Sequence, residues 1–399
     1  MSSAMSSEPS SDEVIVTVFG RTDVGRVRDH NEDAFLVVDL SADNASLQPE
    51  VRQHHLGARG SLFMVADGLG GAAAGEIASE LAINTVYEEL RDRWARSGSD
   101  DPETFARTLK SAAEIANAKI FAYAVEHPEH RGLGTTATIA GLLGDTLYVV
   151  QVGDSRAYLI RDGVARQITK DQSLMQRLVE AGELTQEEAD RSERRNIILQ
   201  ALGPEPTVKI DLTFQQVRRG DTLVLCTDGL SGLVPKEEIA DIIEQEDDLI
   251  AACRELIDRA NENGGPDNIT VVAARFEGAG LADPHEEDEV GHAVFPLPGS
   301  NTPTAPHFAF GDGDTAPLFG QDADSGADDF LVERQVTSGR ALLLAVAGGL
   351  LLLGLLIAAR EWRRAAHAAS PPSSAPVVAP TPAASRPAPA PPPPSAPRH

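Results

Sequence analysis

Short apolar runs separated by polar turns occur throughout the first 280 residues, and they predict β-strands. The runs are rich in valine, isoleucine, leucine and alanine, and most are too short for core helices. Several follow one another through short turns, which makes neighbouring strands antiparallel. We expect strands at Val14–Phe19, Ala34–Val38, Leu62–Ala66, Ala137–Leu142, Leu147–Val152, Ala157–Ile160, Thr222–Cys226 and Ile269–Arg275.

Four other segments have apolar residues at a spacing of three to four, which predicts helices. The order along the chain is strands, two long helices, strands, and then helices followed by a strand. This order favours an α+β fold with two sheets covered by helices over a doubly wound parallel sheet. The predicted helices are Gly75–Arg96, Pro102–Glu126, Lys236–Ile243 and Leu249–Asn263.

The pattern changes after the last predicted strand. Between Leu281 and Gln335 there are 12 acidic residues and one base, Arg334, together with many prolines and glycines, as is typical of a disordered linker. The 19 residues Ala341–Ala359 carry no charge. That length matches a hydrocarbon core of about 30 Å at about 1.5 Å per residue. A buried core helix is the weaker alternative, because disordered composition flanks the segment on both sides.

Five regions follow from these patterns. We expect a disordered start (1–12), a folded domain (13–278), an acidic disordered linker (279–339), a transmembrane helix (340–360) and a tail rich in proline and alanine (361–399).

Composition narrows the possible partners and the compartment. The net charge of −27 disfavours nucleic acid as a partner, since phosphate backbones are repelled. Clustered carboxylates suit divalent cations instead. The only two cysteines, Cys226 and Cys253, lie in apolar settings, so we expect packing roles and a reducing compartment rather than a disulfide framework.

Four predicted strands begin or end beside acidic residues. An aspartate next to a buried strand costs free energy unless its charge is paired. Four such carboxylates in one place would repel one another, and divalent ions with oxygen ligands remove that objection. The segments are Arg28–Asp33, Val65–Gly71, Cys226–Gly229 and Gly264–Asn268.

An Asp-Gly pair is also common in simple turns, and the chain contains one pair that fits a turn and one that fits a metal-binding loop. Asp162-Gly163 joins two short apolar runs and is predicted to be only a hairpin turn. Asp67-Gly68 follows a fully apolar strand and leads through small residues into a long helix. The glycines there allow the backbone to approach an ion, and Gly68 can offer its carbonyl.

Taken together and in order, seven segments of residues 14–276 closely resemble the metal-dependent protein phosphatases of the type 2C (PPM) family. The resemblance implies an αββα sandwich with two central antiparallel sheets. It also implies hydrolysis of phosphoserine and phosphothreonine in proteins, with Mn²⁺ or Mg²⁺ as cofactor. The segments are Val27–Asp33, Asp67–Gly71, Gly134–Thr136, Gly153–Arg156, Ala201–Gly203, Thr227–Gly229 and Asp267–Thr270.

The same resemblance assigns roles to individual residues. Asp67 corresponds to the carboxylate that bridges two metal ions, and Gly68 to a backbone ligand of the first. Asp228 and Asp267 correspond to ligands of the second ion, while Glu32 and Asp33 correspond to carboxylates that hold waters on the ions. Arg28 corresponds to the arginine that binds the substrate phosphate, whose oxygens fit a guanidinium fork. Without the motif, Arg28 would be read as a surface partner of Asp29 or Glu32.

The implied reaction is in-line attack by a water that two metal ions activate, with no phosphoenzyme. Two positions depart from the family pattern. Leu69 stands where many eukaryotic members have a histidine proposed as general acid. Many bacterial members bind a third ion between two aspartates; Asp154 matches one, but Gly232 stands at the other position, which argues against that site.

Three further expectations concern substrate choice, partners and cellular location. The polar segment Thr169–Asn196 corresponds to the family's mobile flap, where we expect substrate choice. The partners are phosphorylated proteins and a cognate serine/threonine kinase. The N-terminus carries no secretory signal, so we expect a single-pass protein of the bacterial inner membrane with its catalytic domain in the cytoplasm.

Two other functions fit the sequence less well than a phosphatase does. A pseudophosphatase that only binds phosphoproteins would have a broken metal set, whereas Asp67, Asp228 and Asp267 are all present. A calcium-binding structural module would need tighter loop spacing than this chain has.

Overall fold

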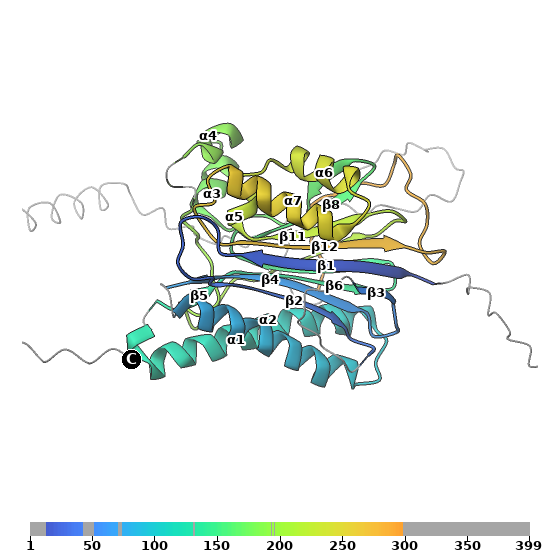
Figure 1. Ribbon diagram of the computed structural model, residues 1–399. Coiled ribbons are helices and arrows are strands. Elements are labelled where there is room, and N and C mark those ends of the chain that lie inside the picture. Colours follow the sequence, from blue (N-terminus) through green and yellow to red (C-terminus); the bar gives the residue numbers. More distant parts are fainter. Residues whose placement is uncertain are drawn as a thin grey trace, which may run out of the picture. The chain divides into compact units, whose positions relative to one another are not determined.

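Two antiparallel β-sheets lie face to face between helices in the computed structural model, which describes residues 13–42, 52–70, 74–130, 132–192, 194 and 196–297 (Figure 1). The first sheet has the order β3 (Arg52–His55), β1 (Ile15–Asp23), β12 (Ile269–Glu277), β11 (Thr222–Cys226), β8 (Arg156–Arg161), β9 (Val164–Gln167). The second has the order β10 (Asp211–Gln216), β7 (Thr146–Val152), β6 (Ala137–Leu143), β4 (Ser61–Leu69), β2 (Asp33–Asp39), and β5 (Gly134–Thr135) pairs with β4.

Strand β4 is apolar at successive positions because both of its faces are buried. Successive side chains of a strand point to opposite faces of the sheet. Leu62 and Met64 pack into the layer beneath the helices, whereas Phe63 and Val65 pack into the layer between the sheets. Because both faces are covered, both sets of side chains must be apolar.

Helices cover the outer face of each sheet. The second sheet is covered by α1 and α2, and the first by α6 and α7 (Figure 1). Helix α2 begins where the sequence predicts, since Pro102 is its first residue and the Asp101 side chain accepts a hydrogen bond from the Thr104 amide. The helical elements are α1 (Ala74–Leu90), a π-helical turn η1 (Arg91–Ala95), α2 (Pro102–Glu126), η2 (Pro128–His130), α3 (Leu174–Glu180), α4 (Gln186–Asp190), α5 (Asp228–Ser231), α6 (Lys236–Gln245) and α7 (Leu249–Glu262).

The predicted α+β sandwich is therefore confirmed, and so is the hairpin at Asp162-Gly163, where both residues have positive φ (50° and 73°). Strands β3, β5 and β10 were not predicted. Strand β3 consists of Arg52–His55 and has no apolar residue, so hydrophobic pattern cannot reveal it.

The acidic linker begins later than the sequence suggests. Residues 279–297 run along the folded domain instead of leaving it: Leu281 is buried, and the Phe295 ring lies edge-on to Tyr148 and Phe214. Asp288 receives two hydrogen bonds from the Arg218 guanidinium, at 2.7 and 2.8 Å. A few apolar residues among many acids supply this packing, and composition averaged over the segment conceals them.

Several predicted segments lie outside the described residues: the start (1–12), the remainder of the linker, the transmembrane helix (340–360) and the tail (361–399). Within the described part of the chain, no helix has the length and apolarity needed to cross a membrane. Cys226 and Cys253 are buried and free, and burial raises the pKa of each thiol to about 12, as suits packing roles.

Candidate active site

Strand topology brings the predicted acidic residues to one end of the sandwich. Strands β2 and β4 are antiparallel, with Asp33 opposite Asp67, so the start of one meets the end of the other. Strands β11 and β12 are also antiparallel, which places Asp228 and Asp267 at a common end of the first sheet. Asp154 lies in the turn that crosses from one sheet to the other.

Threonines hold Asp33 in place beneath the site. Its Oδ2 accepts hydrogen bonds from the hydroxyls of Thr227 (2.8 Å) and Thr270 (2.7 Å). Its Oδ1 is buried and has no hydrogen-bond partner. A buried carboxylate oxygen without a donor costs free energy, and a cation is a natural partner for it.

Burial and mutual repulsion oppose ionisation of these acids. Desolvation, followed by the charges of Asp33 and Asp228, raises the pKa of Asp67 well above its usual range. Desolvation raises the pKa of Asp33 to about 7 and, with the charge of Asp228, that of Asp154 to about 8. Without a cation, the charged cluster therefore opposes folding.

Two glycines allow the backbone to approach these carboxylates closely. A Cβ at Gly68 would lie 2.2 Å from the Gly75 carbonyl oxygen, and one at Gly75 would lie 2.3 Å from Glu32 Oε2. No side chain fits at either position. The first turn of α1 thus packs directly on the segment that carries Asp67 and Gly68, as the small residues after Asp67 predict.

Asn268 ties the Arg28 loop to the rest of the site. Its side-chain amide donates to the carbonyls of Val24 (3.0 Å) and His30 (2.9 Å), and its Oδ1 accepts from the Glu32 amide (2.8 Å). The side chain is almost fully buried. The sequence contains Asn268 in a motif but gives no sign of this role, since the partners are main-chain atoms some 240 positions earlier.

We expect Asn268→Ala to impair both folding and turnover. Three side-chain hydrogen bonds are lost, one buried and two partly buried, each contributing about 1 kcal/mol, so the free energy of unfolding should fall by about 2–3 kcal/mol. The loop that carries Arg28 loses its support, so kcat/KM should also fall. Denaturant titration and a phosphopeptide assay measure the two effects. Asn263→Ala, which removes one exposed hydrogen bond to Leu233, is the matched control and should change little. If the two variants had equal stability and equal activity, Asn268 would not be supporting the loop that carries Arg28.

Arg28 pairs with an acid that the sequence did not suggest. Its Nη2 donates to Asp267 Oδ2 at 2.8 Å, rather than to Asp29 or Glu32. Almost half of its side chain is exposed (47%), so the guanidinium remains open to a ligand in solution.

A pocket of about 190 Å³ opens above these residues. Seven of the eight predicted site residues line it, and Asp33 lies behind the lining. Asn196 and Ile198 also line it, which brings the end of the predicted flap to the site, although neither was predicted as a site residue. The full lining is Arg28, Glu32, Asp67, Gly68, Leu69, Asp154, Asn196, Ile198, Asp228, Asp267 and Asn268.

The third-ion position is incomplete in the structure as well. Gly232 ends α5 and offers no carboxylate, and a Cβ there would lie 2.7 Å from the Asp228 carbonyl oxygen. Asp154 remains as a single buried acid at the wall of the pocket.

The donor set fits hard divalent cations such as Mn²⁺ or Mg²⁺, since carboxylate and carbonyl oxygens are the ligands these ions prefer. Among the described residues, no three acidic, histidine or cysteine side chains already surround one ion position. A set of oxygen donors beside an open guanidinium group suits metal-assisted hydrolysis of an anionic substrate.

Comparison with known proteins gives the family. The model of the protein phosphatase 2C family matches residues 42–271. A serine/threonine phosphatase (stp) of Listeria innocua is 36% identical over 252 residues, which are 63% of this chain and 92% of the relative. PstP of Mycobacterium tuberculosis is 38% identical over 264 residues, 65% of this chain and 45% of the relative.

Solved structures agree with the sequence comparison. The crystal structure of M. tuberculosis PstP/Ppp aligns with a TM-score of 0.55 at 36% identity, covering 66% of this chain and 99% of that one. A structure of the PstP catalytic domain in complex with two manganese ions aligns with a TM-score of 0.53 at 35% identity, covering 66% and 99%. The chain belongs to the protein phosphatase 2C family, which is metal-dependent. Its enzymatic activity is that of a protein-serine/threonine phosphatase.

Proposed function

We propose that this chain is a membrane-tethered phosphatase that removes phosphate from phosphoserine and phosphothreonine with the help of two divalent ions, and that it opposes serine/threonine kinases. The observation that carries the proposal is the convergence of Arg28, Asp67, Asp228 and Asp267 on one pocket. The pseudophosphatase alternative would need a missing metal ligand, and Asp67, Asp228 and Asp267 are all present.

Each residue of the pocket has a task in this proposal. Asp67, Asp228, Asp267 and the Gly68 carbonyl would hold the ions, with Asp67 shared between them. Asp33 and Glu32 would accept hydrogen bonds from the waters of the site. The Arg28 fork would bind two phosphate oxygens and keep the phosphoryl group in line with the attacking water.

The ions, when bound, supply the activation of water and much of the charge neutralisation of the phosphoryl group. The protein supplies positioning. Thr136 takes no part in the reaction itself but holds Asp67 in position. Its hydroxyl accepts a hydrogen bond from the Asp67 amide (3.0 Å), and its amide donates one to the Asp67 carbonyl (2.9 Å). Leu69 cannot donate a proton, so water or another residue would protonate the leaving alkoxide.

The proposal is tested by assaying the purified full-length chain on a phosphothreonine peptide. Activity is expected with Mn²⁺ or Mg²⁺ and should be abolished by a chelator, then restored when the ion is returned. Hydrolysis that survives complete chelation would exclude the metal-assisted mechanism.

The tether rests on the apolar segment 341–359 and the acidic residues before it. Tethering at the membrane would raise the effective concentration of the enzyme near membrane-bound kinases. The balance of flanking charge is nearly even: Arg360, Arg363 and Arg364 follow the segment, and Arg334 and Arg340 precede it. Charge alone slightly favours a cytoplasmic tail.

We expect the opposite orientation, with the catalytic domain in the cytoplasm. Its two free, buried cysteines suit a reducing compartment, and residues 361–399, which follow the apolar segment, have few charges to carry across the membrane. A reporter that is active only in the cytoplasm, fused after His399, should therefore be silent. A strong signal, together with protease cleavage of the catalytic domain in intact spheroplasts, would reverse this topology.

A further inference from the structure

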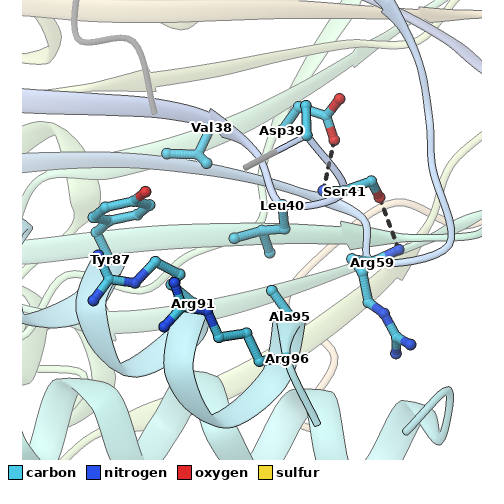
Figure 2. Close-up of a pocket in the computed structure, with 10 residues that line it drawn as sticks. Val38, Asp39, Leu40, Ser41, Arg59, Tyr87, Arg91, Ala95 and Arg96 are labelled. Carbon is cyan, nitrogen blue, oxygen red and sulfur yellow. Dashed lines mark hydrogen bonds between the residues drawn. The ribbon is translucent and has the colours of Figure 1, made fainter. Parts of the chain in front are cut away.

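A second and larger pocket, of about 310 Å³, lies at the other end of the elements that carry the active site (Figure 2). The active site uses the start of β2, the end of β4 and the first turn of α1. The second pocket uses the end of β2, the turn before β4 and the residues at and beyond the end of α1. Seven residues of β2 separate them, or about 20 Å at about 3.3 Å per residue.

The wall of this pocket combines guanidinium groups with apolar surface. Figure 2 shows Arg91 and Arg96 beside Leu40 and Ala95, with Arg59 on the other side. The remaining lining residues are Val38, Asp39, Ser41, Ala42 and Tyr87. Positive charge gathered here is unusual for a chain whose net charge is −27.

The arginines are only partly neutralised. Arg91 donates to Asp92 at 2.9 and 3.3 Å, and Arg96 donates to the same carboxylate at 2.9 Å. One acid thus serves two guanidinium groups. Among the described lining residues the only acid is Asp39, which accepts a hydrogen bond from the Ser41 amide. In the part of the chain that the structure describes, Arg59, Arg91 and Arg96 therefore outnumber the carboxylates of Asp39 and Asp92, which favours binding of an anion.

A π-helical turn brings two of these arginines together. The amide of Arg96 donates to the carbonyl of Arg91 at 3.2 Å, a bond between residues five apart. Such a bond sets Arg96 one turn above Arg91, whereas in an α-helix residues five apart would be separated by about 140° around the axis. Turns of this kind are frequent at functional sites.

The turn is held by a buried anchor. The Trp94 side chain is fully buried, its Nε1 donates to the Arg59 carbonyl at 2.8 Å, and its ring lies 4.9 Å from that of Phe105. The Arg59 guanidinium lies 5.8 Å from the Trp94 ring and donates to the Ser99 carbonyl. Arg59 and the π-helical turn are therefore fixed relative to each other, so the pocket is preorganised.

We propose that this pocket binds a small organic anion, namely a phosphate or carboxylate group carried on an apolar or aromatic body. Arg91 and Arg96 would bind the anionic group, and Leu40, Ala95 and the Tyr87 ring would contact the body. The volume lies at the lower end of the range for small-molecule sites, about 300–1,000 Å³. The site is separate from the catalytic pocket, and the proposal does not depend on the reaction there.

The test uses calorimetric titration of the full-length, metal-free protein. Without ions the catalytic pocket has five acidic side chains against one arginine, Arg28, and repels anions, so binding reports the second pocket. Phenylphosphonate is the main probe, with a dissociation constant of about 1 mM or lower expected for a ligand of ten non-hydrogen atoms. Benzoate tests a carboxylate on the same ring, and inorganic phosphate, which lacks the ring, should bind more weakly.

A pair of matched variants decides the assignment. Arg93 and Arg96 are equally exposed (59%), and each pairs with an acid four residues earlier, but only Arg96 lines the pocket. Arg96→Glu should weaken phenylphosphonate binding at least tenfold, and Arg93→Glu should change it less than twofold. Arg91→Gln, which keeps the side-chain length, should also weaken binding. Equal effects of the two glutamate variants, or no binding by the native protein at tenfold higher concentration, would overturn the proposal.

Discussion

Asp67→Asn should lose nearly all phosphatase activity, by about 10³-fold or more in kcat. Asp67 is the acid proposed to be shared by both ions, so the amide weakens two binding sites at once. Each tenfold loss in rate corresponds to about 1.4 kcal/mol, and metal-ion catalysis is worth several kcal/mol. The measurement is turnover of a phosphothreonine peptide across a titration of Mn²⁺.

The same variant should stabilise the metal-free fold. Burial and the charges of neighbouring acids raise the pKa of Asp67, which means that its ionised form opposes folding at neutral pH. The neutral amide removes that cost. We expect the melting temperature of the metal-free variant to rise by at least about 3 °C, while Mn²⁺, which should stabilise the native protein, stabilises the variant much less.

The chain offers its own control for this substitution. Asp162→Asn changes the Asp-Gly pair that forms only a turn, in the β8–β9 hairpin. Asparagine tolerates the positive φ of 50° at that position. Its activity and its response to Mn²⁺ should match those of the native protein. Full activity of Asp67→Asn would contradict the two-ion proposal, whereas an unchanged melting temperature would contradict only the role of charge repulsion.

The predictable part of this fold is the part whose residues are buried on both faces. Strands such as β4 and β12 have largely apolar sequences. The acids at their ends stand out because an aspartate beside a buried strand costs free energy unless its charge is paired. That contrast identified the pocket. Strand β3 is polar throughout and pairs with β1 at the edge of the described sheet, so its sequence carries no such contrast.

Features that depend on distant contacts could not be predicted. The partner of Arg28 is Asp267, 239 positions away, and the three hydrogen bonds of Asn268 link it to the same early loop. A motif places these residues in one region but does not specify which atoms meet. The π-helical turn is similar, because it depends on where Trp94 can be buried and not on a repeating pattern.

The pairing of Arg28 with Asp267 gives the last prediction. Arg28→Ala should reduce kcat/KM for phosphopeptides by about 10²-fold or more, since a charge-assisted, two-pronged contact with phosphate contributes about 3 kcal/mol. It should not weaken ion binding, because Asp267 loses a competing cation rather than a ligand. Calorimetric titration with Mn²⁺ should therefore give an affinity equal to or higher than that of the native protein.

Two further variants separate charge from geometry. Arg28→Lys keeps the positive charge but loses the planar fork, so its activity should lie between those of the native protein and Arg28→Ala. Arg26→Ala removes an exposed arginine of the same loop that does not line the pocket, and its activity should be unchanged. If Arg28→Ala instead bound Mn²⁺ less tightly, the arginine would be supporting the ion site through Asp267, and its proposed contact with phosphate would lose its basis.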